Sequence, residues 1–166
     1  SAGRTPPHWS GFKFFNVYGF GERHKTRMAS VVLHGFDQIR NGGILKLFQS
    51  HRAGIEHGHQ KRDFIYVEDV VSVLLFALEK PIHRGIFNLG SGTARTFLDL
   101  ARATFRALHL PEKVEFIPMP ESFRERYQYF TQADMSRLKA EGYPHPFASL
   151  EEGVAATVKE LLAAQK

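Results

Sequence analysis

Two segments of this sequence, residues 12–17 and 86–89, are apolar on both faces of an extended strand, and a glycine follows each within two residues. Strands of this kind belong to sheets that helices cover on both sides. Two of them are too few for an open parallel sheet of ordinary size. We therefore expect the chain to be a piece of a larger α/β domain.

Helices alternate with the predicted strands. Apolar side chains recur at helical spacing in residues 28–40 and in residues 68–80, a largely buried helix that Pro81 ends. Capping boxes, in which Ser or Thr precedes an acidic residue by three positions, predict further helix starts at Thr96, Thr131 and Ser149. Shorter strands are predicted at 45–48, 63–67 and 114–117. This alternation places the chain in the α/β class.

The composition is that of a globular domain and narrows the possible partners. Of the 166 residues, 43% are hydrophobic and 23% charged, which argues against disorder. The longest apolar run, residues 70–78, is too short to cross a bilayer, and no secretion signal opens the sequence, so we expect a cytoplasmic protein. The net charge of +5 is not gathered in runs, which favours a phosphorylated small ligand over nucleic acid or a membrane.

The end of the opening strand carries the strongest candidates for ligand contacts. Ligands of open α/β sheets lie beyond the carboxyl ends of strands, where Asn16 and Tyr18 stand. The cationic segment 19–27 follows and contains Glu22 and Lys25. Such a segment before a helix suits a phosphate or a polar sugar, although an ordinary solvated loop explains the local pattern equally well.

Other candidates are weaker when taken one at a time. Arg62 precedes an apolar strand and can present two donors to a diphosphate, but a surface ion pair with Asp63 or Glu68 explains it more simply. Residues 50–61 form a predicted surface loop whose histidines, at 51, 57 and 59, lack the companion ligands of a metal motif. The glycines at 90 and 92 lack the third glycine of a dinucleotide loop, and we interpret them as a tight turn.

Six segments together resemble the extended short-chain dehydrogenase/reductases, the family of nucleotide-sugar epimerases and dehydratases. They are residues 14–19 (FFNVYG), 24–25 (HK), 28–31 (MASV), 61–70 (KRDFIYVEDV), 85–92 (GIFNLGSG) and 126–134 (RYQYFTQAD). The second, third and last are similar to the branch that acts on ADP-heptose. The resemblance covers about residues 11–162 and implies the C-terminal part of a Rossmann-type fold, with a few parallel strands and a small mixed α/β substrate-binding domain.

The resemblance also implies the organisation of the whole protein. Residues 1–10 would be a linker, and residues 11–166 the substrate-binding half. The family's G-x-x-G-x-x-G loop and Y-x-x-x-K pair belong to an earlier half, and neither occurs here. We therefore expect NADP or NAD to be bound mainly by that missing N-terminal half, the partner of this chain, and the chain alone to be inactive. A homo-oligomer is expected as well.

The reaction implied is an epimerisation at carbon 6 of an ADP-heptose, in which a hydride leaves and returns to the other face. Lys25 matches the family's second acid/base lysine and also a cofactor contact. Asn16 matches a substrate contact and Val17 a cofactor contact. The other positions expected to hold the ADP-sugar are Arg27, which flanks Lys25, and His34, Phe48, Arg62 and Tyr127, with Arg62 the best candidate for the diphosphate.

Three other functions fit parts of the sequence. The substrate can be another nucleotide sugar, handled by a different epimerase or a dehydratase of the family. The fold can serve as a non-catalytic binding module, in which case the parent protein would also lack the Tyr-Lys pair. A basic nucleic-acid binder ranks last, because the sequence shows neither a stacking platform nor a basic helix.

Overall fold

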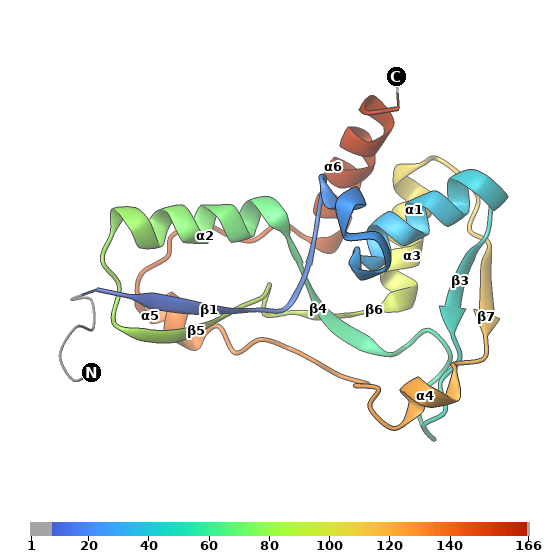
Figure 1. Cartoon of the computed structure of the whole chain (residues 1–166), viewed down its shortest axis with the longest axis horizontal. Helices are drawn as coiled ribbons and strands as arrows, with labels where there is room; N and C mark the ends of the chain where they lie inside the picture. Colours follow the sequence, from blue (N-terminus) through green and yellow to red (C-terminus); the bar gives the residue numbers. More distant parts are fainter. Residues whose placement is uncertain (1–7, 166) are drawn as a thin grey trace.

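The computed structural model describes residues 8–165 and has two lobes joined by a narrow middle (Figure 1). The narrow lobe contains β1 (Ser10–Phe14), α2 (Val67–Glu79), β5 (Gly85–Leu89) and α5 (Ser136–Ala140). The helical lobe contains η1 (Glu22–Met28), α1 (Val31–Gly42), β3 (Leu45–Phe48), α3 (Phe97–Ala107), β7 (Val114–Ile117), α4 (Glu121–Arg124) and α6 (Leu150–Ala163). Between them lie β2 (Asn16–Tyr18), β4 (Lys61–Tyr66) and β6 (Ala94–Thr96).

In the described part of the chain, residues 8–165, three small sheets with mostly parallel pairing make up the strand framework. β1 pairs with β5, and β3 pairs with β7, both in parallel. The middle sheet has the order β2-β4-β6, with β2 parallel and β6 antiparallel to β4. Parallel strands joined through helices confirm the α/β class expected from the sequence.

The opening strand is divided, whereas the sequence predicted one continuous strand. Phe15 separates β1 from β2: its amide still donates to Leu89 of β5, at 3.0 Å, while its carbonyl accepts from the Val17 amide at 2.9 Å. At this local turn the pairing of β1 with β5 ends and the pairing of β2 with β4 begins. The predicted linker, residues 1–10, lies mostly outside the described residues, and Ser10 already belongs to β1.

The narrow lobe leaves apolar side chains exposed on both faces of its two-stranded sheet. Phe14 of β1 is 51% exposed and Ile86 of β5 is 64% exposed, so these strands are not covered on both sides within residues 8–165. The expectation that α2 is largely buried is wrong as well. Only Val70 and Val73 of this helix are buried, and its outer face carries the exposed side chains of Val71, Leu75 and Leu78.

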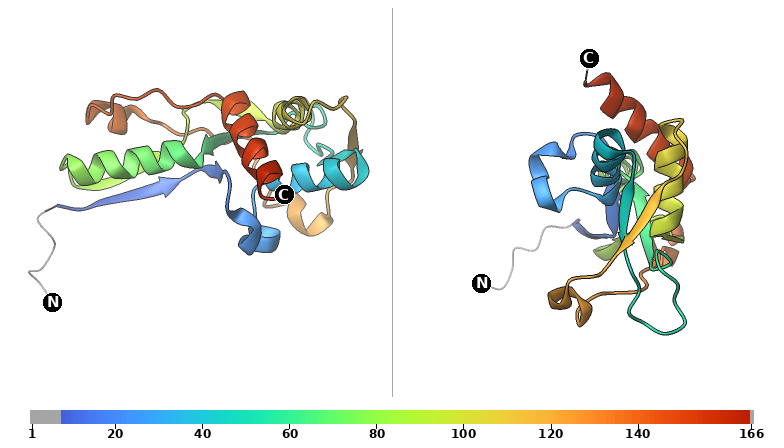
Figure 2. Two further views of the ribbon diagram at one scale, coloured as in Figure 1. Left: turned by 90° about the horizontal axis from the view of Figure 1, so that it is seen from above. Right: turned by 90° about the vertical axis from the view of Figure 1, so that its right-hand side faces the viewer.

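The helical lobe holds the larger part of the core. α3 and α6 pack side by side (Figure 2), with Leu100, Val154 and Val158 buried between them and the middle sheet. α1 covers the same core with Val32 and Phe36. It begins later than predicted, because Ser30 caps it by accepting from the Leu33 amide, and Met28 belongs instead to the short 3₁₀ segment η1.

Two of the three predicted capping boxes are confirmed. Thr96 with Asp99 opens α3, and Ser149 with Glu152 opens α6. The third, at Thr131, is wrong. The Thr131 amide donates to the Lys61 carbonyl of β4, which keeps this segment extended, and α5 begins only at Ser136, whose amide donates to Asp134 at 2.9 Å.

A buried carboxylate joins the middle sheet to the narrow lobe. Asp63 of β4 is fully buried and accepts from Ser91 (amide 2.6 Å, hydroxyl 2.7 Å), from the Gly92 amide at 2.9 Å and from the Ala133 amide at 2.9 Å. It therefore holds the glycine turn that the sequence predicted at residues 90–92, and the chain enters β6 before α3.

Among residues 8–165, no helix has the length and apolarity needed to span a bilayer.

Candidate functional site

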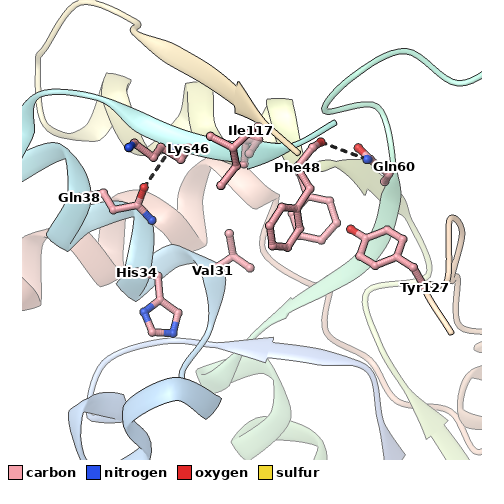
Figure 3. Close-up of a pocket in the computed structure, with 10 residues that line it drawn as sticks. Val31, His34, Gln38, Lys46, Phe48, Gln60, Ile117 and Tyr127 are labelled. Atoms are coloured by element: carbon pink, nitrogen blue, oxygen red, sulfur yellow. Dashed lines mark hydrogen bonds between the residues drawn. The ribbon is translucent and has the colours of Figure 1, made fainter. Parts of the chain in front are cut away.

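The first cavity opens beside α1 and has a volume of 530 Å³ (Figure 3). It is lined by Val31, His34, Gln38, Lys46, Leu47, Phe48, Gln60, Phe97, Ile117 and Tyr127. α1, β3, β7 and the start of α3 contribute most of these side chains, which are largely apolar. A cavity of this size with apolar walls and a few convergent polar groups is typical of a small-molecule site.

Two glutamines at opposite ends of the first cavity are fixed by backbone contacts (Figure 3). Gln60 is 1% exposed, and its Nε2 donates to the Phe48 carbonyl at 3.2 Å. Gln38 accepts from the Lys46 amide through Oε1, at 2.9 Å. Each amide has a further polar atom, so the pair can offer both a donor and an acceptor to a ligand.

Arg62 lies directly behind the first cavity. It is 8% exposed, and its guanidinium carbon is 5.1 Å from the centre of the Tyr127 ring and 5.7 Å from that of Phe97. Nη1 donates to the Lys61 carbonyl at 2.9 Å. Burial lowers the pKa of Arg62 from its ordinary value and raises the pKa of Tyr127, while the nearby Arg62 charge acts to lower the latter.

The ion-pair alternative for Arg62 is wrong for the described residues. Asp63 is engaged by the turn at residues 91–92 and by Ala133. Arg62 forms no salt bridge with a carboxylate in residues 8–165. An arginine held between two aromatic rings, with unused donors in its guanidinium, is suited to an incoming phosphate.

The second cavity lies alongside β2, between η1 and the start of α1, and has a volume of 320 Å³. Asn16, Val17 and Lys25 all line it, together with the buried carboxylate of Glu22. Lys25 Nζ lies 3.6 Å from Glu22 Oε2. Val31, the first residue of α1, lines both cavities, so the two adjoin at the start of this helix.

The structure thus gathers most of the predicted residues around one helix start. His34, Phe48 and Tyr127 line the first cavity, and Asn16, Val17 and Lys25 line the second. Arg62 contacts the first cavity through Tyr127 and Phe97. Arg27 is exposed and lines neither cavity.

Of the predicted loop at residues 50–61, Gln60 lines the first cavity, whereas the histidines at 51, 57 and 59 line neither cavity. His57 accepts from the Ser50 amide through Nδ1, at 3.0 Å, and His59 lies 3.6 Å from Glu56. In the part of the chain that the structure describes, no three His, Asp or Glu side chains are grouped so that they could hold a metal ion.

Sequence reasoning missed several residues of the first cavity. Gln38, Lys46, Phe97 and Ile117 belong to no motif and come together only through packing. Two others carried a usable signal: Val31 ends the motif segment 28–31, and Gln60 directly precedes the motif segment 61–70.

Comparison with known proteins shows the family to which this chain is related. Residues 8–90, half of the chain, match the model of the NAD dependent epimerase/dehydratase family. An ADP-L-glycero-D-manno-heptose-6-epimerase of Fusobacterium nucleatum subsp. nucleatum is 48% identical over an alignment of 164 residues, which covers 95% of this chain and 49% of that relative. One of Nitratidesulfovibrio vulgaris is 45% identical over 155 residues, covering 93% of this chain and 48% of that relative.

Solved structures agree with these matches. The crystal structure of ADP-L-glycero-D-manno-heptose-6-epimerase from Helicobacter pylori has a TM-score of 0.77 and 29% identity, and covers 94% of this chain and 45% of that chain. A UDP-N-acetylglucosamine 4-epimerase from Methanobrevibacter ruminantium has the same TM-score at 21% identity, which shows the shared fold. The chain spans about half the length of the curated relatives it matches. It belongs to the NAD-dependent epimerase/dehydratase family, as its sequence motifs led us to expect.

Proposed function

We propose that this chain is the nucleotide-sugar-binding half of an NAD(P)-dependent epimerase that inverts carbon 6 of an ADP-heptose. The observation that carries the proposal is the meeting of two cavities at Val31. One has flat apolar walls with Arg62 behind them, and the other holds Asn16 and Lys25. This arrangement suits a ligand with a nucleobase at one end, a diphosphate in the middle and a sugar at the other.

In this proposal the first cavity receives the nucleotide. Phe48, Phe97 and Ile117 provide surfaces for the base, and Gln38 and Gln60 provide amides that can pair with its edge. Arg62, supported by Tyr127, provides the charge for the diphosphate. The similarity to relatives named for ADP-heptose supports adenine as the base.

The second cavity receives the heptose and the reactive end of the cofactor. At 320 Å³ it suits a sugar beside one ring of the cofactor rather than a whole dinucleotide. The residues present fit that limited share: Val17 and Asn16 of β2 would hold the cofactor and the sugar, and Lys25 would give or take a proton at the reacting oxygen. When bound, NAD(P) supplies the hydride acceptor and donor for carbon 6.

The remaining part of the cofactor site would come from a second segment, corresponding to the part of the relatives that this chain does not cover. Within residues 8–165, β1 pairs only with β5, and the side chains of Phe14, Ile86 and Leu78 are exposed. An unpaired strand edge beside exposed apolar side chains suits the addition of further strands and helices. We propose that the narrow lobe, through its unpaired strand edge and these exposed side chains, receives the missing half. The homo-oligomer and the cytoplasmic location stay predictions.

A chimera tests the proposed function. The part of the Fusobacterium nucleatum relative outside its aligned region would be fused to this chain, and ADP-heptose epimers would be separated by chromatography after incubation with NADP or NAD. We expect interconversion of the two carbon 6 epimers by the chimera and none by this chain alone. A folded chimera that binds the cofactor and leaves ADP-heptose unchanged, or turnover by this chain alone, would refute the proposal. Parallel incubation with UDP-sugars tests the alternative substrate class.

A further inference from the structure

Among residues 8–165, Glu22 is the one carboxylate that lines the second cavity, and it is buried, with 5% of its surface exposed. It opens η1, in a segment that otherwise carries cationic side chains at Arg23, Lys25 and Arg27. A buried carboxylate is costly unless hydrogen bonds and opposite charge compensate it. Its contacts therefore indicate what it stabilises.

Three of these contacts come from the two ends of the loop that carries Lys25. Glu22 accepts from the Gly19 amide at 3.2 Å, just after β2. It also accepts from the Ser30 amide at 2.8 Å and from the Ser30 hydroxyl at 2.6 Å. Ser30 is the N-cap of α1. One carboxylate thus fixes the end of the strand to the start of the helix and closes the loop between them.

The fourth contact is Lys25 itself. Its Nζ lies 3.6 Å from Glu22 Oε2, and the lysine side chain is 43% exposed while that of Glu22 is 6% exposed. The next residue, Thr26, has φ 49° and ψ −115°, a backbone conformation that a β-branched residue adopts only when its surroundings impose it. The loop is therefore held in a strained form that directs Lys25 toward the wall of the second cavity.

We propose that Glu22 is a positioning residue for Lys25: it fixes the loop through Gly19 and Ser30 and holds the ammonium group beside Asn16 through its charge. The inference rests on the proposed function for the role of Lys25, and it adds a residue to which no motif assigned a role. The inference requires that the negative charge of Glu22, and not only its hydrogen bonds, determines the position of the Lys25 ammonium group.

Glu22→Gln tests this in the chain as it stands. Glutamine removes the charge and keeps one acceptor oxygen, which can serve either the Ser30 amide or the Gly19 amide with the Ser30 hydroxyl. The Lys25→Met background described below separates the loss of the charge from the loss of a loop contact. The rate of Lys25 acetylation by a succinimidyl ester would be followed by peptide mass spectrometry, with the exposed Lys159 of α6 as internal reference. We expect Lys25 to react about 2–5-fold faster in Glu22→Gln, because an ion pair of this partly exposed kind is worth up to roughly 1 kcal/mol. Glu112→Gln, which removes the exposed ion pair with Arg102, should leave Lys25 unchanged.

A second measurement separates positioning from a merely structural role. In the chimera, Glu22→Gln should lower kcat by about 10-fold or more with KM changed less than twofold, since a placed proton-transfer group contributes roughly 10²–10⁴-fold. In a Lys25→Met background the same change should lower the residual rate less than twofold, because the pair acts as a unit. An unchanged acetylation rate, or a further loss in the Lys25→Met background, would overturn the inference. A chimera without epimerase activity refutes the proposed function instead, and the acetylation result still decides the role of Glu22.

Discussion

The guanidinium of Arg62 lies over the ring of Tyr127, 5.1 Å from its centre, behind the cavity assigned to the nucleotide. Two chain segments that are 65 positions apart thus share one wall of the site. In this geometry Arg62 provides the positive charge of the site, and the ring of Tyr127 supports the Arg62 side chain. The two roles can be tested separately.

Replacing Arg62 by lysine should weaken the binding of ADP. Lysine keeps the charge and loses both the planar contact with the rings and the paired donors, so we expect affinity to fall about tenfold, equivalent to roughly 1.4 kcal/mol. Isothermal titration calorimetry measures it. Arg106→Lys, an exposed change on α3, is the control. Equal affinities of Arg62→Lys and the unaltered chain would remove Arg62 from the site.

Replacing Tyr127 separates the ring from the hydroxyl. Tyr127→Phe keeps the surface over Arg62 and should bind ADP within about twofold of the unaltered chain. Tyr127→Leu removes the π-face and should weaken binding several-fold, since such contacts contribute about 0.5–2 kcal/mol. A loss in Tyr127→Phe as large as that in Tyr127→Leu would show that the hydroxyl, not the ring, matters.

The packing of α6 against the middle sheet depends on a glycine. A Cβ added at Gly153 would collide with the Tyr18 hydroxyl and lie 3.0 Å from Tyr66 Cβ. We expect Gly153→Ala to lower the free energy of unfolding by about 1–3 kcal/mol, measured by urea denaturation. Gly42→Ala is the matched control, because nothing lies within 4 Å of its added Cβ. It should be neutral or slightly stabilising. A neutral Gly153→Ala would mean that α6 lies farther from Tyr18.

Much of this fold followed from local sequence signals, and the failures have a common physical cause. The capping boxes at Thr96 and Ser149 were predicted because their partners lie three residues away. The box at Thr131 failed because its amide bonds to Lys61, 70 positions earlier in the chain, and a local pattern contains no trace of that contact. The break at Phe15 is likewise set by the change of partner from β5 to β4.

The site was predictable only where motifs carried it. The resemblance supplied Asn16, Lys25, Phe48 and Tyr127, which line the two cavities. Without the resemblance, the local sequence pattern at these residues fitted a ligand site and an ordinary solvated loop equally well. Gln38 and Ile117 escaped prediction because they meet across the cavity only after α1 and β7 have packed.

The acid stability of the contact between β6 and α6 should depend on Glu151. Arg95 donates to its carboxylate at 3.2 and 2.7 Å, and this hydrogen bonding holds the pKa of Glu151 below its ordinary value of 4.5. A carboxylate with a lowered pKa in the folded state stabilises the protein above the pKa of the unfolded state and loses this effect as pH falls through the folded value.

Glu151→Gln should therefore lower Tm at neutral pH, with a difference that is constant above about pH 6. The difference should shrink toward zero as pH falls below 4.5. Thermal unfolding followed by circular dichroism across this range measures it. A Tm difference that persisted unchanged at pH 3 would show that the effect is not electrostatic.

Titration of the ¹⁵N-labelled chain with ADP, followed by two-dimensional NMR, tests the nucleotide site most directly. We predict saturable shift changes at residues that line the first cavity, including Val31, His34, Phe48 and Gln60, and none along the exposed face of α2. The absence of saturable changes up to about 10 mM ADP, where binding would be weaker than roughly −3 kcal/mol, or changes confined to another surface, would contradict the account.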